Sequence, residues 1–207
     1  METGLISQIN TFCTWFGRMV FLNLLWLFFT VIGIGIFGFF PSTIAMITVI
    51  KSWLRKDDNQ PIAFLFWKTY KREFLKSQSL GLFALIIGVI LLLDFHFIFS
   101  PELSIPIYIQ MIFLLMGITY IITILYTLSL YVFLKMNFKS YIKNSIILVF
   151  THPMHSLILV ISCFIMIYLS FRYAGMLLFF TGSILALIMA TVTQDIIRKV
   201  KTKSIVQ

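Results

Sequence analysis

Long apolar runs separated by short polar stretches dominate the pattern along this chain. The first run extends from Met19 to Ile50 without a charged side chain. A continuous helix of that length would measure ~48 Å, whereas the hydrocarbon core of a bilayer is only ~30 Å thick. Because glycines and then Pro41 interrupt the run, we predict a first membrane span over residues 19–50 that is broken near Pro41, between Gly38 and Pro41.

Charged residues mark the ends of four further apolar runs, each long enough for a transmembrane helix. The length of the chain suits one compact unit and not two. The sequence therefore predicts an all-α fold, a polytopic transmembrane helical bundle with about five spans. It forms one membrane domain over residues 1–207, in which the later spans cover residues 77–99, 107–134, 153–171 and 176–194.

Three other segments are amphipathic. In residues 1–17, apolar side chains recur at three- and four-residue spacing opposite a face of Ser, Gln, Asn and Thr. Residues 62–76 and 138–150 mix aromatic or aliphatic side chains with lysine and arginine. This pattern is typical of helices that lie in the membrane interface, and we expect one at each segment.

The composition agrees with a membrane location, because 60% of the residues are hydrophobic and only 11% are charged. The net charge of +9 alone would also suit a nucleic-acid-binding protein. However, the basic residues gather in the connections beside the predicted spans and at the C-terminus. The positive-inside rule places those regions in the cytoplasm. We therefore expect a lipid bilayer with anionic headgroups as the partner, and not nucleic acid.

The side on which the N-terminus lies depends on the first run. If residues 19–50 cross the membrane once, residues 1–18 lie outside the cell. If Pro41 reverses the chain, they lie inside, although the second leg of ~10 residues would then be only ~15 Å long. Arg18 favours the inside placement.

Polar side chains and helix breakers within the spans are candidate functional positions. A polar group in lipid costs several kcal/mol unless it finds a partner. Asn23 is therefore expected to hydrogen-bond a neighbouring helix. Trp26, Gly38 and Pro41 accompany it in the first run, where the predicted break makes them candidate hinge positions.

The later spans contribute four more candidates. Asp94 and His96 have the spacing of a proton or cation site, but we favour a solvated carboxylate beside an imidazole at the interface. Asn144 is expected to make an interhelical or interfacial contact. His152 and His155 lack a third ligand nearby, so we expect no metal site there.

Motifs of well-known enzyme classes are missing from the sequence, among them Gly-x-Ser-x-Gly, His-Glu-x-x-His and the phosphate-binding glycine loop. Cys13 and Cys163 lie in apolar contexts far apart in the chain, which favours packing roles over a disulfide. We therefore expect no catalytic residue, no cofactor and no metal, and a protein that is not an enzyme.

Several short motifs resemble one known family. They are Asn23–Trp26, Gly38–Met46, Lys51–Arg55 and Phe66–Phe74, followed later by His152-Pro153. These stretches resemble the YesL-like family of small bacterial integral membrane proteins, a domain of unknown function often encoded beside carbohydrate-uptake transporters and saccharide-degrading enzymes. The resemblance covers most of the chain and implies a location in the bacterial plasma membrane. It brings no catalytic residues with it.

Two functions follow as expectations. The resemblance implies a non-enzymatic accessory or regulatory partner in carbohydrate uptake or utilisation, which would bind a carbohydrate transporter subunit or a sensor protein. The alternative is a small sugar permease, in which the broken first span and the polar residues Asn23, Asp94 and His96 line a path.

Overall fold

The computed structural model describes residues 2–57, 60–100 and 105–206. Within these residues all regular structure is helical, and five helices are long and apolar enough to cross a membrane: α1 from Asn10, α2, α3, α4 and α6. The predicted all-α, multi-pass membrane architecture is thus confirmed. The helices are α1 (Glu2–Ile32), α2 (Ile36–Leu54), α3 (Ile62–Ile98), α4 (Ile107–Phe133), α5 (Phe138–Thr151), α6 (Pro153–Arg172), α7 (Ala174–Phe179) and α8 (Thr181–Val206).

Helix α1 ends in a Schellman motif. The backbone N–H of Gly35 donates to the carbonyl of Thr30 over 2.9 Å, and the N–H of Ile34 donates to the carbonyl of Val31 over 3.0 Å. Ile34 and Gly35 both adopt positive φ, 62° and 64°. The prediction that the chain breaks between Gly38 and Pro41 is therefore wrong in position, because the left-handed turn comes before α2 begins.

The two helices on either side of this turn form an antiparallel hairpin. Trp15 of α1 meets Trp53 near the end of α2, with ring centroids 5.6 Å apart. At the closed end, a Cβ added to Gly38 would lie 2.5 Å from the carbonyl oxygen of Thr30, so only glycine permits this approach of the backbones. The start of the chain and the basic segment after α2 thus lie at the same end of the hairpin, as the reversal alternative required.

Pro41 lies inside α2 without ending it. Its ring nitrogen has no hydrogen to donate to the carbonyl of Phe37, one turn earlier. That carbonyl instead accepts a hydrogen bond of 2.8 Å from Nε2 of Gln78 in α3. The side chain from a neighbouring helix therefore satisfies the backbone group that proline releases, and α2 continues through the site.

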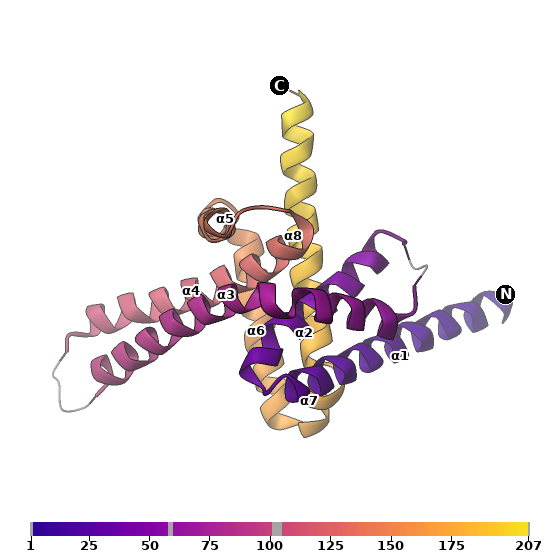
Figure 1. Ribbon diagram of the computed structural model, residues 1–207, viewed down its shortest axis with the longest axis horizontal. Helices are drawn as coiled ribbons and strands as arrows, with labels where there is room; N and C mark the ends of the chain where they lie inside the picture. The colour runs from indigo at the N-terminus through magenta and orange to yellow at the C-terminus, as the bar shows by residue number, and fades with distance from the viewer. Residues whose placement is uncertain (1, 58–59, 101–104, 207) are drawn as a thin grey trace.

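Helix α2 is the centre of the molecule. It packs against α1, α3, α4 and α8, and most of its side chains are buried. In Figure 1, the α3–α4 hairpin projects to the left, the N-terminal part of α1 to the right and the C-terminal part of α8 upward, while α2 lies where they meet. The core residues Ile44, Met46, Ile47 and Ile50 all come from this helix.

Two of the segments expected to be separate interfacial helices are parts of longer ones. Residues 62–76 continue without a break into the predicted span 77–99, and both belong to α3. Residues 2–17 likewise continue into the rest of α1. No proline separates either segment from the apolar run that follows it, and the single glycine at the border of the first segment, Gly17, lies inside α1 without ending it. The third amphipathic segment, 138–150, matches α5.

The last predicted span, residues 176–194, is divided between α7 and α8, which meet at Phe180 with φ −137° and ψ −30°. The predicted spans 107–134 and 153–171 correspond closely to α4 and α6. Small residues Ala186 and Ala190 on α8 are almost fully buried, so this helix lies close to its neighbours.

Candidate functional site

A cavity of about 600 Å³ lies where α2, α3, α4 and the start of α5 meet. Four cationic side chains and one carboxylate line it, which gives the lining a net charge of +3. These charged residues are Lys51, Arg72, Glu73, Lys76 and Lys135. We call this space the basic cavity.

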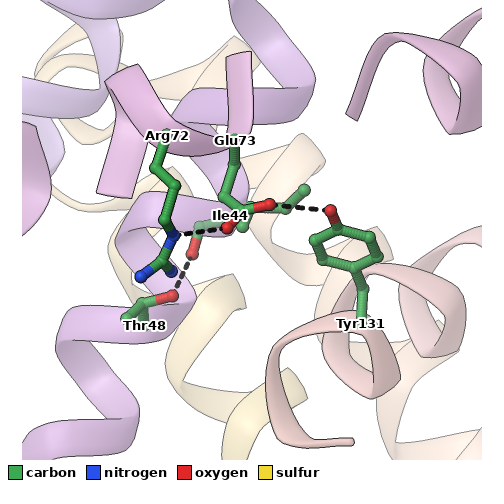
Figure 2. A network of polar contacts seen from close by, with 5 residues as sticks. All are labelled: Ile44, Thr48, Arg72, Glu73 and Tyr131. Carbon is green, nitrogen blue, oxygen red and sulfur yellow. Dashed lines mark hydrogen bonds and ion pairs between the residues drawn. The ribbon is translucent and has the colours of Figure 1, made fainter. Parts of the chain in front are cut away.

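Glu73 is the buried acid of the basic cavity, with only 8% of its surface exposed. Both of its carboxylate oxygens are engaged. Nε of Arg72 lies 2.6 Å from Oε1, and the hydroxyl of Tyr131 donates to Oε2 over 2.7 Å (Figure 2). A buried carboxylate is tolerated when it is paired and hydrogen-bonded in this way. The contact with Tyr131 is also a hydrogen bond between α3 and α4.

Arg72 is oriented by this pairing. Its side chain is 58% exposed, so it borders the open part of the cavity. The bond to Glu73 uses Nε, while the terminal nitrogens of the guanidinium lie on the side of Thr48 (Figure 2). The hydroxyl of Thr48 itself donates to the carbonyl of Ile44 within α2. A guanidinium has five donors, so an arginine held through Nε still presents donors to an anion.

Lys51 closes the cavity from the side of α2. Its ammonium donates to the carbonyl of Val132 over 2.6 Å and lies 5.1 Å from the ring centroid of Phe133. Val132 is in the last turn of α4, where carbonyls lack partners within the helix. A lysine at this end of a helix also interacts favourably with the helix dipole.

The connection between α4 and α5 is held in place by Tyr141. Its hydroxyl donates to the carbonyl of Leu134 over 2.9 Å and accepts from the backbone N–H of Met136 over 3.0 Å. Lys135 lies between these two residues and is exposed at the rim, as is Lys76 on α3. Two exposed cations therefore flank an opening whose backbone is hydrogen-bonded to Tyr141. The arrangement suits an anion, because nearby cationic donors form short, charge-assisted hydrogen bonds with carboxylates and phosphates.

The structure places the candidate residues from the first run in helix packing. Asn23 is fully buried, and its Nδ2 donates to the carbonyls of Leu177 and Leu178 over 3.1 and 2.7 Å. Its Oδ1 accepts from the N–H of Ser183 over 3.0 Å. These groups flank the break between α7 and α8, so Asn23 satisfies backbone atoms that the break leaves unpaired. The expected contact of Asn23 with a neighbouring helix is thus present.

Trp26 and Gly38 join α1 to α2. Nε1 of Trp26 donates to the hydroxyl of Thr43 over 3.0 Å. Gly38 provides the close backbone approach described above, and Pro41 is buried in α2 beside it. The three residues act in packing between helices, and none of them lines the basic cavity.

The other four candidates fall in three separate places. Asp94 and His96 are near the end of α3 that projects with α4 (Figure 1), where His96 is exposed. Nδ2 of Asn144 lies 3.2 Å from the sulfur of Met136. His152 occupies the junction of α5 and α6 and meets His155 edge-on at 5.7 Å between ring centroids. The structure therefore does not gather the eight candidate residues into one site.

Sequence reasoning missed the basic cavity because its residues come from the first apolar run and the segment after it, the amphipathic segment 62–76, the span 107–134 and the stretch that follows it, and no local pattern links them. The one available signal was Glu73, an acid surrounded by basic residues in an otherwise positive amphipathic segment. Tyr131 gave no signal, since aromatic residues are common near membrane surfaces.

Known proteins place the chain in a family. Residues 19–95 match the family described as "Protein of unknown function, DUF624". This range contains the four main motifs of the resemblance and covers the second part of α1, all of α2 and most of α3. No solved structure is significantly similar to the chain.

Three proteins of Bacillus subtilis (strain 168), all described as uncharacterized, are similar over most of their length. YesV is 31% identical over 91% of this chain and 91% of its own. YteU is 29% identical, over 96% of this chain and 89% of its own, and YesL is 28% identical, over 91% and 89%. The structure has several helices that could span a membrane, and the relatives match over about nine-tenths of their length. The chain therefore belongs to the DUF624 family of proteins of unknown function, the YesL-like family that its motifs indicate.

Proposed function

We propose that this chain is a non-enzymatic accessory or regulatory membrane protein in carbohydrate uptake or utilisation, and that its basic cavity binds an anionic group. The observation that carries the binding proposal is the charge of the cavity. Its lining holds four cationic side chains, and the one carboxylate among them is already engaged by Arg72 and Tyr131. An anion that enters the cavity meets donors without meeting a free negative charge.

The chemical class of the ligand follows from the donors. Lysine acts as a compact point charge and arginine as a planar fork, and both suit phosphate or carboxylate oxygens. Low-dielectric walls strengthen such contacts, because less water competes for the charges. The proposed ligand is therefore a molecule or partner segment that carries a phosphate or carboxylate.

The carbohydrate part of the proposal rests on the family resemblance, since members of the family are often encoded beside carbohydrate-uptake transporters and saccharide-degrading enzymes. The expected partner is a carbohydrate transporter subunit or a sensor protein in the plasma membrane. An accessory role is favoured over the permease alternative by the position of Asn23. Its amide is fully engaged at the break between α7 and α8, whereas Asp94 and His96 lie on the projecting part of α3.

The proposal is tested by complementation. A strain that lacks the gene is grown on single saccharides and receives either the natural protein, the pair Lys76→Gln with Lys135→Gln, or the control pair Lys71→Gln with Lys139→Gln. The control removes the same charge from α3 and α5 outside the basic cavity. We expect the deletion to slow growth on one saccharide, and the natural protein and the control pair to restore it. The cavity pair should fail at equal membrane abundance.

Two results would contradict the proposal. If the deletion strain grew normally on every saccharide that the products of the neighbouring genes import or degrade, the carbohydrate role would be wrong. If the cavity pair restored growth fully, the basic cavity would have no part in the function. Sugar flux into liposomes that contain only the purified protein would instead favour the permease.

A further inference from the structure

A second cavity of about 420 Å³ lies between α3, α4 and α5. Its lining contains no charged residue and is formed almost entirely by aliphatic and aromatic side chains, with Thr and Tyr hydroxyls along α4. Phe40 of α2 closes one end, where its ring packs on Gly81 of α3 so tightly that an added Cβ would lie 2.7 Å from the ring. We call this space the apolar cavity.

On three of the four helices that the two cavities share, α2, α3 and α4, the apolar cavity begins one helical turn beyond the basic cavity. On α3, Lys76 lines the basic cavity and Leu80 the apolar one. On α4, Tyr131 lines the basic cavity and Thr127, one turn earlier in the chain, lines the apolar one. On α2, Ile44 lines the basic cavity and Phe40, also one turn earlier, lines the apolar one. On α5, the adjacent residues Tyr141 and Ile142 line one cavity each. A turn of helix rises about 5.4 Å, so the two cavities follow one another directly along the gap between α3 and α4.

The border between the two cavities also has the polarity of a membrane surface. Up to Lys76, α3 carries four basic residues and one acid, and from Ser77 to Leu93 it carries no charge. Lysine side chains at such a border extend toward the headgroups while their stems stay in apolar surroundings. The basic cavity therefore lies at headgroup depth, and the apolar cavity lies at the depth of acyl chains.

We propose that the two cavities together bind one anionic glycerophospholipid. Its phosphate lies among Lys76, Lys135 and Arg72, and one acyl chain occupies the apolar cavity between α3 and α4. This inference rests on the proposed anion site and names its ligand. A free sugar phosphate would fill the basic cavity but leave the apolar one without an occupant, and a neutral or zwitterionic lipid would gain little from a lining of net charge +3.

The experiment uses the full chain in detergent micelles and native mass spectrometry, with three probes: dioleoyl-phosphatidylglycerol, dioleoyl-phosphatidylcholine and glycerol 3-phosphate. We expect one phosphatidylglycerol per chain, bound about tenfold or more tightly than phosphatidylcholine or glycerol 3-phosphate. The pair Lys76→Gln with Lys135→Gln should weaken phosphatidylglycerol binding about thirtyfold, since two basic contacts to an anionic headgroup are lost. The control pair Lys71→Gln with Lys139→Gln should not.

A second pair of variants tests the acyl chain separately. Ala84 lines the apolar cavity, so Ala84→Phe should weaken phosphatidylglycerol binding and leave glycerol 3-phosphate binding unchanged. The matched control is Ala63→Phe, which adds the same ring at an exposed position of α3 outside both cavities. The comparison of the three probes on the natural protein needs no variant, so a folding defect in Ala84→Phe does not remove the test.

Two outcomes separate the inference from the proposed function. Equal binding of phosphatidylglycerol and phosphatidylcholine, or unchanged phosphatidylglycerol binding in Ala84→Phe, would overturn the lipid site. If glycerol 3-phosphate still bound in a lysine-dependent way, the anion site itself would stand. If neither anionic probe depended on Lys76 and Lys135, both proposals would be wrong.

Discussion

Gln78 of α3 donates its side-chain amide to the carbonyl of Phe37 in α2 over 2.8 Å, at the position where Pro41 removes a backbone donor. The contact explains how a buried helix tolerates an internal proline. It also leads to a prediction about Gln78 and Pro41, which both affect the Phe37 carbonyl.

Gln78→Leu should destabilise the natural protein by about 1 kcal/mol, because the Phe37 carbonyl loses its partner. In a Pro41→Ala background the alanine N–H can reach that carbonyl, so Gln78→Leu should then have a much smaller effect. The four proteins of this double-mutant cycle are compared by thermal unfolding in detergent. Additive effects would show that Gln78 does not substitute for the missing donor.

Asn23→Leu should destabilise the protein by about 2–5 kcal/mol. The substitution removes the hydrogen-bond partner of the carbonyls of Leu177 and Leu178 and of the buried N–H of Ser183. Thermal unfolding measures the loss. The control is Asn10→Leu on the exposed part of the same helix, which should change stability little. Equal effects of the two variants would mean that the contact at the break between α7 and α8 is unimportant.

Ile34→Gly should stabilise the protein by about 1 kcal/mol. Isoleucine is β-branched and is held at φ 62°, where glycine has no steric penalty, and its side chain is 81% exposed. Ile32→Gly, two residues earlier and still helical, should instead destabilise by a similar amount. The two variants therefore shift the unfolding temperature in opposite directions, and a shift of the same sign for both would contradict the geometry of the turn.

Glu73→Gln should tighten anion binding while it weakens the fold. The substitution removes the one carboxylate of the basic cavity and releases Arg72 from its ion pair, so the attraction for an anion increases. The contact between α3 and α4 through Tyr131 loses its charged acceptor, which should cost about 1 kcal/mol. Phosphatidylglycerol affinity and thermal unfolding measure the two effects.

The control for Glu73→Gln is Asp195→Asn, which makes the same change in net charge at an exposed position of α8. It should alter neither property appreciably. A parallel gain in affinity in both variants would mean that overall charge, and not the cavity, controls binding.

The sequence predicts the helical architecture well, because hydrophobic length and charge spacing are local properties. The helices α4, α5 and α6 have nearly the predicted bounds for this reason. The predicted position of the break in the first run was wrong because proline is a strong local signal, whereas α1 ends in the left-handed turn at Ile34 and Gly35. The close approach of Gly38 to Thr30 that follows this turn is a contact between two helices. Asn23 was correctly expected to contact another helix, although its partner near Ser183 lies far away in the chain.

The basic cavity could not be predicted, because it depends on tertiary packing. Glu73 and Tyr131 are 58 positions apart in the chain, and only the packing of α3 on α4 brings them together. Lys51 is 81 positions from the carbonyl that it caps. Periodicity within one segment gives no information about such pairs.

The central place of α2 has a consequence for how the protein is made. This helix leaves the ribosome early, yet one of the helices that surrounds it, α8, is synthesised last. Until then, part of the surface of α2 faces lipid or assembly factors instead of its own chain, and the core remains incomplete. A stop codon before Thr181 would therefore remove more than a tail, since it leaves the middle of the molecule open to membrane quality-control proteases. We expect such shortened products to be degraded, even though all five candidate membrane spans of the described residues have been synthesised.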